Sequence, residues 1–141
     1  DAVAAASIRT RESLRDTEQR IADLALLGKQ IDTYRKLKPV YDRYKASKDK
    51  EKFLRGFESE IILFEAAARE IKKAGLTRLP SSDKVKAELE GLSARKAALQ
   101  AELRKIQREE KEYDTLRQNV DALLERPKEQ EQQRQRSNDL E

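Results

Sequence analysis

The sequence predicts an all-α protein, an elongated antiparallel coiled-coil or helical bundle of two long helices and one shorter helix. Ala, Glu, Lys, Leu, Arg and Gln dominate the 141 residues, and all six are strong helix formers. Only 4 Gly and 3 Pro interrupt them, and 41% of the residues are charged, against about 25% in an average protein. This composition is typical of long, exposed helices with narrow apolar stripes.

The longest predicted helix covers residues 82–126, a stretch without Pro that carries a heptad repeat. A seven-residue repeat keeps one stripe facing a partner helix, so we assign its apolar residues to a helix interface. They are Val85, Leu92, Leu99, Ile106, Tyr113 and Val120. A coiled-coil helix has a second core position, which here lies four residues after each of these apolar residues. It is polar at Lys96, Glu110 and Arg117, which favours a non-identical partner helix over a self-paired zipper. A homodimer remains an alternative.

Two further helices are predicted at about residues 8–45 and 50–74, each from apolar residues at helical spacing. The second of them has the widest apolar face, so we expect it to be the most buried of the three. Pro39 is expected to kink the first helix without ending it, because the apolar spacing resumes directly after it.

Local signals mark the ends of these helices. Ser47 or Asp49 is suited to cap the start of the helix at 50–74, and Ser81 or Ser82 the start of the longest helix. Gly75 fits the position that follows a helix end.

We expect residues 1–126 to form one helical coiled-coil unit. Residues 127–141 are rich in Glu, Gln and Arg, so we expect Pro127 to end the long helix and a disordered polar tail to follow. The alternative is that this segment prolongs the helix past Pro127. The final Leu140-Glu141 is typical of a cloning remnant, and the missing initiator Met suggests a piece of a larger cytoplasmic protein.

The composition argues against most catalytic and metal-binding chemistry. The chain has no His and no Cys, so the usual ligands of zinc, haem and iron–sulfur clusters are missing, as are the imidazole base and the thiol nucleophile. We therefore expect no enzymatic activity, cofactor, metal site or small-molecule substrate. No apolar run approaches the ~20 residues that a membrane-spanning helix needs, so we expect no membrane partner.

Positive charge is concentrated in residues 35–55, here called the basic segment. Its net charge is +6, in a chain whose total is +4. The nine basic residues are Arg35, Lys36, Lys38, Arg43, Lys45, Lys48, Lys50, Lys52 and Arg55. Such a patch is suited to DNA phosphates, and the interleaved Tyr34, Tyr41 and Tyr44 are available to stack on bases. The alternative is a solvated helix end whose tyrosines pack against neighbouring helices, which their helical spacing favours for the rings.

Four stretches carry a family resemblance: IDTYRKLKPVYDRYK at 31–45, KFLRGFESEIILFEAA at 52–67, LTRLPS at 76–81 and NVDALL at 119–124. They resemble the C-terminal half of relaxases, the mobilisation proteins of conjugative elements in Gram-positive bacteria. Relaxases nick DNA with a tyrosine and a histidine-bound metal in an N-terminal domain, and this chain has no His. The resemblance implies a non-catalytic accessory region that contacts DNA or relaxosome and coupling proteins during plasmid or transposon mobilisation.

Two other interpretations come from different classes of protein. One is a purely structural coiled-coil spacer or oligomerisation module with no nucleic-acid role. The other is a metal-dependent nuclease that acts on its own, which the absence of His and the scarcity of pockets on a thin helical rod disfavour.

Overall fold

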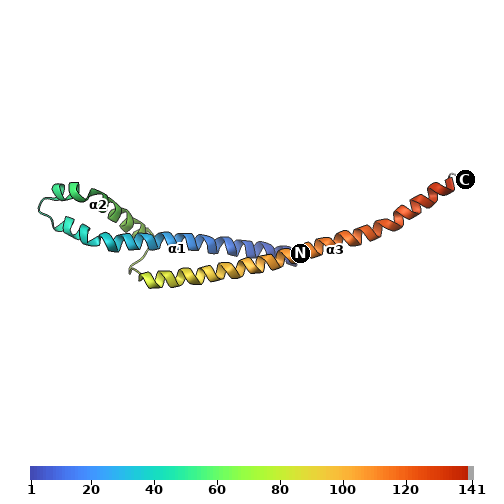
Figure 1. Ribbon diagram of the computed structural model, residues 1–141, viewed down its shortest axis with the longest axis horizontal. Helices are drawn as coiled ribbons and strands as arrows, with labels where there is room; N and C mark the ends of the chain where they lie inside the picture. Colours follow the sequence, from blue (N-terminus) through green and yellow to red (C-terminus); the bar gives the residue numbers. More distant parts are fainter. Residues whose placement is uncertain (140–141) are drawn as a thin grey trace. The chain divides into compact units, whose positions relative to one another are not determined.

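The computed structural model contains three helices, α1 (Ala2–Ala46), α2 (Lys50–Lys73) and α3 (Ser82–Asp139), with 45, 24 and 58 residues (Figure 1). It describes residues 1–139, except for the side chains of 127–130 and 137–139, and the expected cloning remnant Leu140-Glu141 lies outside the described residues. No strand occurs among residues 1–139. The predicted all-α fold, with two long helices and a shorter one between them, is confirmed.

The chain divides into two compact units, whereas the sequence predicts a single unit over residues 1–126. One unit is Arg15–Ala97, which holds most of α1, all of α2 and the start of α3. The other combines Asp1–Leu14 with the part of α3 from Ala98 onward. Two units arise because α1 and α3 are long enough to take part in two separate sets of contacts.

In the unit Arg15–Ala97, α2 packs antiparallel on α1. The rings of Tyr34 and Phe64 stack with their centroids 4.7 Å apart, and those of Tyr44 and Phe53 lie 6.2 Å apart. Tyr44 comes after Tyr34 in α1, but its partner Phe53 comes before Phe64 in α2, so the two helices run in opposite directions. The buried apolar residues of α2 are Ile61, Phe64, Ala67 and Ile71, whereas among the described residues α1 contributes Ile31 alone and α3 contributes Val85 and Ile106, so the expected burial of α2 is confirmed.

Helix α3 runs antiparallel to α1 in the same unit. A Cβ added at Gly28 would stand 3.1 Å from Val85 Cγ1, so the side chain of Val85 packs directly against the backbone of α1 at this glycine. Lys96 Nζ lies 3.8 Å from Glu18 Oε1 further along the pair. Lys96 occupies the polar second core position, so α1 supplies the non-identical, charge-pairing partner that the heptad pattern predicts.

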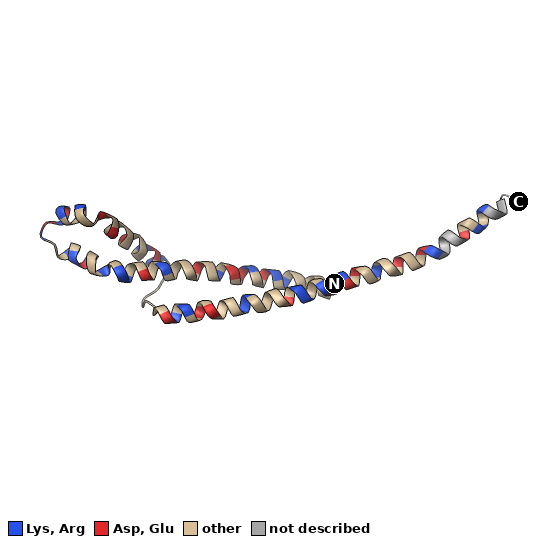
Figure 2. Cartoon of the chain, viewed as in Figure 1, with Lys and Arg blue, Asp and Glu red and all other residues tan. Residues whose placement is uncertain are grey.

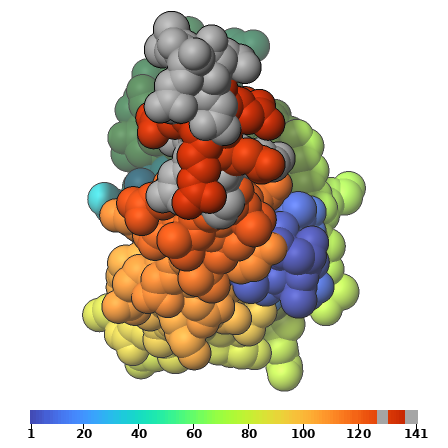
Figure 3. All heavy atoms as spheres, turned by 90° about the vertical axis from the view of Figure 1, so that its right-hand side faces the viewer, coloured from blue at the N-terminus to red at the C-terminus, as the bar shows by residue number. Residues whose placement is uncertain are grey.

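The second unit is held by the first turns of α1 against α3. Ser7, Thr10 and Ile106 are all buried, with 4%, 6% and 6% of their surfaces exposed. Figure 3 shows the start of α1 (blue) lying directly on α3 (orange). The burial of Ser7 and Thr10 on α1 and of Ile106 on α3 marks the contact between the two helices in this unit.

Each helix begins at a side-chain cap. Asp1 Oδ1 accepts a 2.7 Å hydrogen bond from Ala4 N, so α1 starts at Ala2 and not near residue 8 as predicted. Asp49 caps α2 and Ser81 caps α3, each accepting a 3.1 Å bond from the backbone N–H three residues on. Both caps are among those predicted, because a hydroxyl or carboxylate satisfies an otherwise unpaired N–H.

Helix α2 ends as its sequence predicts. Gly75 has φ +73° and its N–H donates to Lys72 O at 3.0 Å. Only glycine adopts that left-handed backbone without steric cost. Within α2, Phe57 departs from helical geometry, with φ −133° and ψ 29°.

The prediction that Pro127 ends the long helix is wrong, because α3 continues to Asp139. Residues 127–139 are helical, which agrees with the alternative of a prolonged helix and not with a disordered tail. Glu, Gln, Lys and Arg surround Pro127, and their high helix propensity favours helix on both sides of it. Helix α1 likewise continues through Pro39 to Ala46, as expected.

Candidate nucleic-acid interface

The basic segment forms the end of the α1–α2 hairpin. It comprises the last turns of α1, the connection at residues 47–49 and the first turns of α2. Figure 2 shows its Lys and Arg residues gathered along both helices where the chain turns back. Because the helices are antiparallel, residues that lie far apart along the segment are brought together. All nine basic residues are exposed.

The connection between α1 and α2 is closed by short hydrogen bonds. The backbone N–H of Ser47 donates to Tyr44 O at 3.2 Å, and its hydroxyl donates to Asp49 O at 3.1 Å. The Asp49 carboxylate in turn accepts from Lys52 N. The N-terminus of α2 is therefore held in a fixed direction beside the end of α1.

Three lysines, Lys48, Lys50 and Lys52, surround this N-terminus. The N-terminal end of a helix carries a partial positive charge, which favours acidic side chains there and disfavours basic ones. The Asp49 carboxylate caps this end and Glu51 lies in the first turn, so acids already offset the helix dipole. The three lysines nevertheless outnumber these two acids, an arrangement that the helix dipole does not favour and that gives the end a net positive charge.

Four of the nine cations have contacts within the protein. One guanidinium NH2 of Arg35 donates to Pro80 O at 2.7 Å and lies 3.4 Å from Leu79 O. Lys38 Nζ lies 3.3 Å from Asp42 Oδ1 in an exposed pair. Arg35 therefore fastens the α2–α3 connector to α1, and its charge is partly committed to that task.

The other two contacts are with aromatic rings. The guanidinium carbon of Arg43 lies 5.6 Å and 5.7 Å from the ring centroids of Phe53 and Phe57. Lys45 Nζ lies 5.4 Å from the ring centroid of Tyr41. A cation over a ring keeps its positive charge, so both side chains remain able to attract a phosphate.

Five cations of the basic segment form no ion pair or hydrogen bond through their side chains within the described residues. They are Lys36, Lys48, Lys50, Lys52 and Arg55. Of the three acids in the segment, Asp42 pairs with Lys38 and Asp49 caps α2. The free charge of the segment is therefore strongly positive.

The tyrosine rings are packed, which confirms the alternative interpretation for them. Tyr34 and Tyr41 stack on Phe64 with centroids 4.7 Å and 4.3 Å away, and Tyr44 lies 6.1 Å from Tyr41. All three tyrosines are half-buried. The three rings therefore take part in packing within the α1–α2 hairpin, and the exposed groups of the segment are its basic side chains.

The six residues assigned to a helix interface fall into two groups. Val85 and Ile106 are buried, with 7% and 6% exposed, and Leu92 and Leu99 between them are half-buried. Tyr113 and Val120 are instead 55% and 45% exposed. The heptad repeat alone does not distinguish the two groups, because it reports the stripe on one helix and not the length of its partner.

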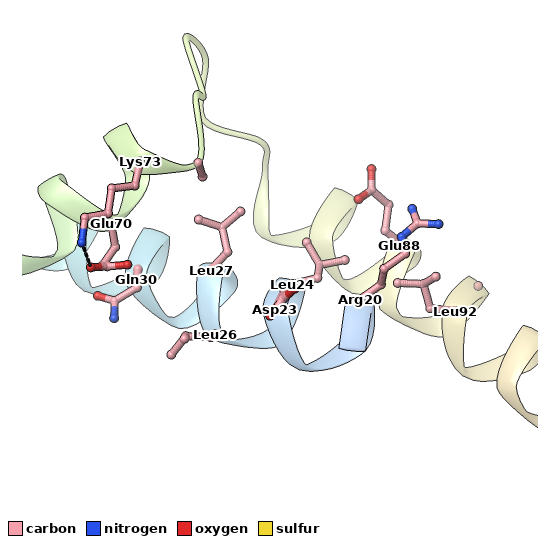
Figure 4. A pocket seen from close by; sticks show the side chains of 12 residues that line it. Arg20, Asp23, Leu24, Leu26, Leu27, Gln30, Glu70, Lys73, Glu88 and Leu92 are labelled. Atoms are coloured by element: carbon pink, nitrogen blue, oxygen red, sulfur yellow. Dashed lines mark hydrogen bonds and ion pairs between the residues drawn. The ribbon is translucent and has the colours of Figure 1, made fainter. Parts of the chain in front are cut away.

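A groove of about 750 Å³ lies between α1, the end of α2 and the start of α3. Figure 4 shows Leu24 and Leu27 of α1 and Leu92 of α3 lining it, beside the ion pair of Lys73 with Glu70 at 3.3 Å. Its walls are apolar, and the charged side chains at its edge include both acids and bases, so the groove does not indicate a particular class of ligand.

Three further observations bear on function. Among the described residues no group of three or more Asp, Glu, His or Cys is placed to hold a metal ion. No helix over the same residues is both long enough and apolar enough to cross a membrane. No family model, curated protein or solved structure matches the chain.

Proposed function

We propose that this chain is a non-catalytic accessory region of a conjugative relaxase, which acts in the cytoplasm during plasmid or transposon mobilisation. It supports the assembly of relaxosome or coupling proteins and contacts DNA through phosphates, without reading sequence. The link to relaxases rests on the resemblance of four stretches between residues 31 and 124. The DNA contact rests on the basic segment.

The observation that carries the DNA contact is the cluster of Lys48, Lys50 and Lys52 around the N-terminus of α2. These lysines are exposed, form no side-chain ion pair within the described residues and outnumber the acids Asp49 and Glu51 at the same helix end. Phosphate contacts of this kind position a protein on DNA and carry no sequence information.

The test is DNA binding by a charge-reversed variant, measured as fluorescence anisotropy of labelled duplex and single-stranded DNA at ~50 mM salt. The variant carries Glu at positions 45, 48, 50 and 52. Three of these positions flank the N-terminus of α2, where acids are favourable, so the fold is retained. We expect binding to be lost.

The matched control reverses the exposed cations Lys84, Lys86, Arg95 and Lys105 of α3, which changes the net charge by the same amount. We expect this control to weaken binding only modestly. Equal losses in the two variants would mean that net charge, and not the basic segment, attracts DNA. Binding that survives reversal of the basic segment would refute the proposed interface.

A second candidate function is an oligomerisation module without a nucleic-acid role. It is favoured by the exposed apolar residues in the second half of α3, which include Leu116, Leu123 and Leu124 with 62%, 60% and 66% exposed. The two candidates separate in the same experiment, because a module of this kind gives no DNA binding at low salt.

A further inference from the structure

The second half of α3 carries an apolar stripe that nothing in the described part of the chain covers. Tyr113, Leu116, Val120 and Leu123 follow one another at steps of three, four and three residues, which places them on one face of the helix. Their exposed fractions range from 45% to 62%, and every residue from 111 to 126 is exposed. Isolated apolar residues are common on surfaces, but a stripe at helical spacing marks an interaction site.

The stripe continues an interface that is already formed. Ile106 lies one heptad before Tyr113 and is buried beneath the first turns of α1. Figure 1 shows α3 continuing beyond the start of α1 with no other segment of its unit alongside.

The sequence pattern changes where the covered part ends. Up to Ile106, the second core position lies four residues after the first, at Leu89, Lys96, Leu103 and Glu110. From Tyr113 onward, apolar residues lie three residues later, at Leu116 and Leu123, while the position four residues later holds Arg117 and Leu124. The apolar face therefore extends to a side of α3 that is charged in the first half of the helix, and it has two apolar core positions, as in a helix that pairs with its own copy.

The identity of the core residues fits a two-stranded pair. If Tyr113 and Val120 occupy position a of the heptad, then Leu116 and Leu123 occupy position d. In parallel coiled coils, a β-branched residue at a with leucine at d, as at Val120 and Leu123, favours two strands over three or four.

The flanking charges favour a parallel orientation of the two helices. In a parallel pair, position g of one helix meets position e of the next heptad of its partner. Glu112 and Arg126 occupy position g, so Glu112 lies opposite Arg117 of the second copy and Arg126 lies opposite its Glu131. An antiparallel pair instead places Arg117 opposite Arg117 of the second copy.

We propose that α3 pairs through Tyr113, Leu116, Val120 and Leu123 with the same residues of a second copy, as a parallel, in-register two-stranded coiled coil. This inference is independent of the DNA contact. The apolar seam has four core layers and has ended by Arg134, which occupies position a two heptads after Val120. An interface this small is typical of a concentration-dependent dimer.

The first test is the molar mass in solution, measured by sedimentation from low micromolar to near-millimolar protein. We expect a monomer–dimer equilibrium in the wild type and a monomer throughout in the double variant Leu116→Ser/Leu123→Ser. These side chains are exposed in the monomer, so the substitutions spare its fold. The control Leu63→Ser changes a similarly exposed leucine in α2, 55% exposed, and should leave the equilibrium unchanged.

The second test fixes the orientation of the two chains. Glu112→Arg creates a repulsion with Arg117 of the second copy and should weaken the dimer, as should Arg117→Glu. The combination of both changes should restore it. Residues five apart do not face each other on one helix, so such a rescue arises between chains.

A disulfide provides an independent check, because the described residues contain no free cysteine. Val120→Cys places two thiols opposite each other only in a parallel, in-register pair, so oxidation should give a covalent dimer. A monomer at all concentrations would overturn the inference. A dimer that the leucine substitutions leave intact, or one without charge rescue and disulfide formation, would also overturn it.

Discussion

Gly28 of α1 lies so close to Val85 of α3 that a Cβ at position 28 would stand 3.1 Å from Val85 Cγ1. Few real Cβ contacts are this short, so the side chain of Val85 occupies the space that a larger residue at 28 would need. The glycine that interrupts the helix pattern of α1 therefore leaves room for the side chain of Val85 where α1 and α3 pack together.

A pair of glycine substitutions tests this relationship. Gly91→Ala should stabilise the protein by about 0.5–1 kcal/mol, because the site is open and alanine is the better helix former. Gly28→Ala should lose that gain to the contact with Val85 and leave the stability unchanged or lower. Urea unfolding followed by circular dichroism measures both. Equal stabilisation by the two substitutions would contradict the close approach.

The stacked rings at the α1–α2 hairpin should dominate the stability of that region. Phe64 is 5% exposed and stacks on Tyr34 and Tyr41, so Phe64→Ala should cost about 3–5 kcal/mol. Leu63→Ala, at the exposed neighbouring position, should change stability by less than about 0.5 kcal/mol. Thermal unfolding of the two variants separates them, and similar melting temperatures would argue against the ring stack as the centre of the core.

Arg35 is predicted to stabilise the fold in addition to contributing positive charge to the basic segment. Arg35→Met removes the hydrogen bonds to Pro80 O and Leu79 O and should cost about 1 kcal/mol. Lys36→Met removes a charge with no such contacts and should be nearly neutral. Urea denaturation gives both values. If the two variants were equally stable, the connector would not depend on Arg35.

The sequence predicts most of the helices because their signals are local. Asp49, Ser81 and Gly75 stand at helix ends and act there through short hydrogen bonds or backbone conformation. Pro127 misleads because proline is a strong local helix breaker, whereas the many helix formers on both sides of it favour helix over a longer stretch. The start of α1 is hard to predict because its cap, Asp1, is the first residue and has no sequence before it to mark a helix boundary.

The candidate site was predicted in part. Charge is visible in a sequence, so the position of the basic segment follows directly from its residues. The role of Arg35 in holding the connector and the stacking of Tyr41 on Phe64 depend on partners tens of residues away. For the same reason the sequence does not reveal that Ile106 is covered and Tyr113 exposed, since both occupy one heptad position.

The most direct test of the proposed function is the salt dependence of DNA binding by the wild-type chain. Five unpaired cations in the basic segment predict that log K falls against log salt with a slope of about −4, as phosphates release their counterions. Affinity should then drop several-hundred-fold between ~50 and ~200 mM salt. Absence of binding at the lower concentration, or binding that salt leaves unchanged, would contradict a phosphate interface on the α1–α2 hairpin.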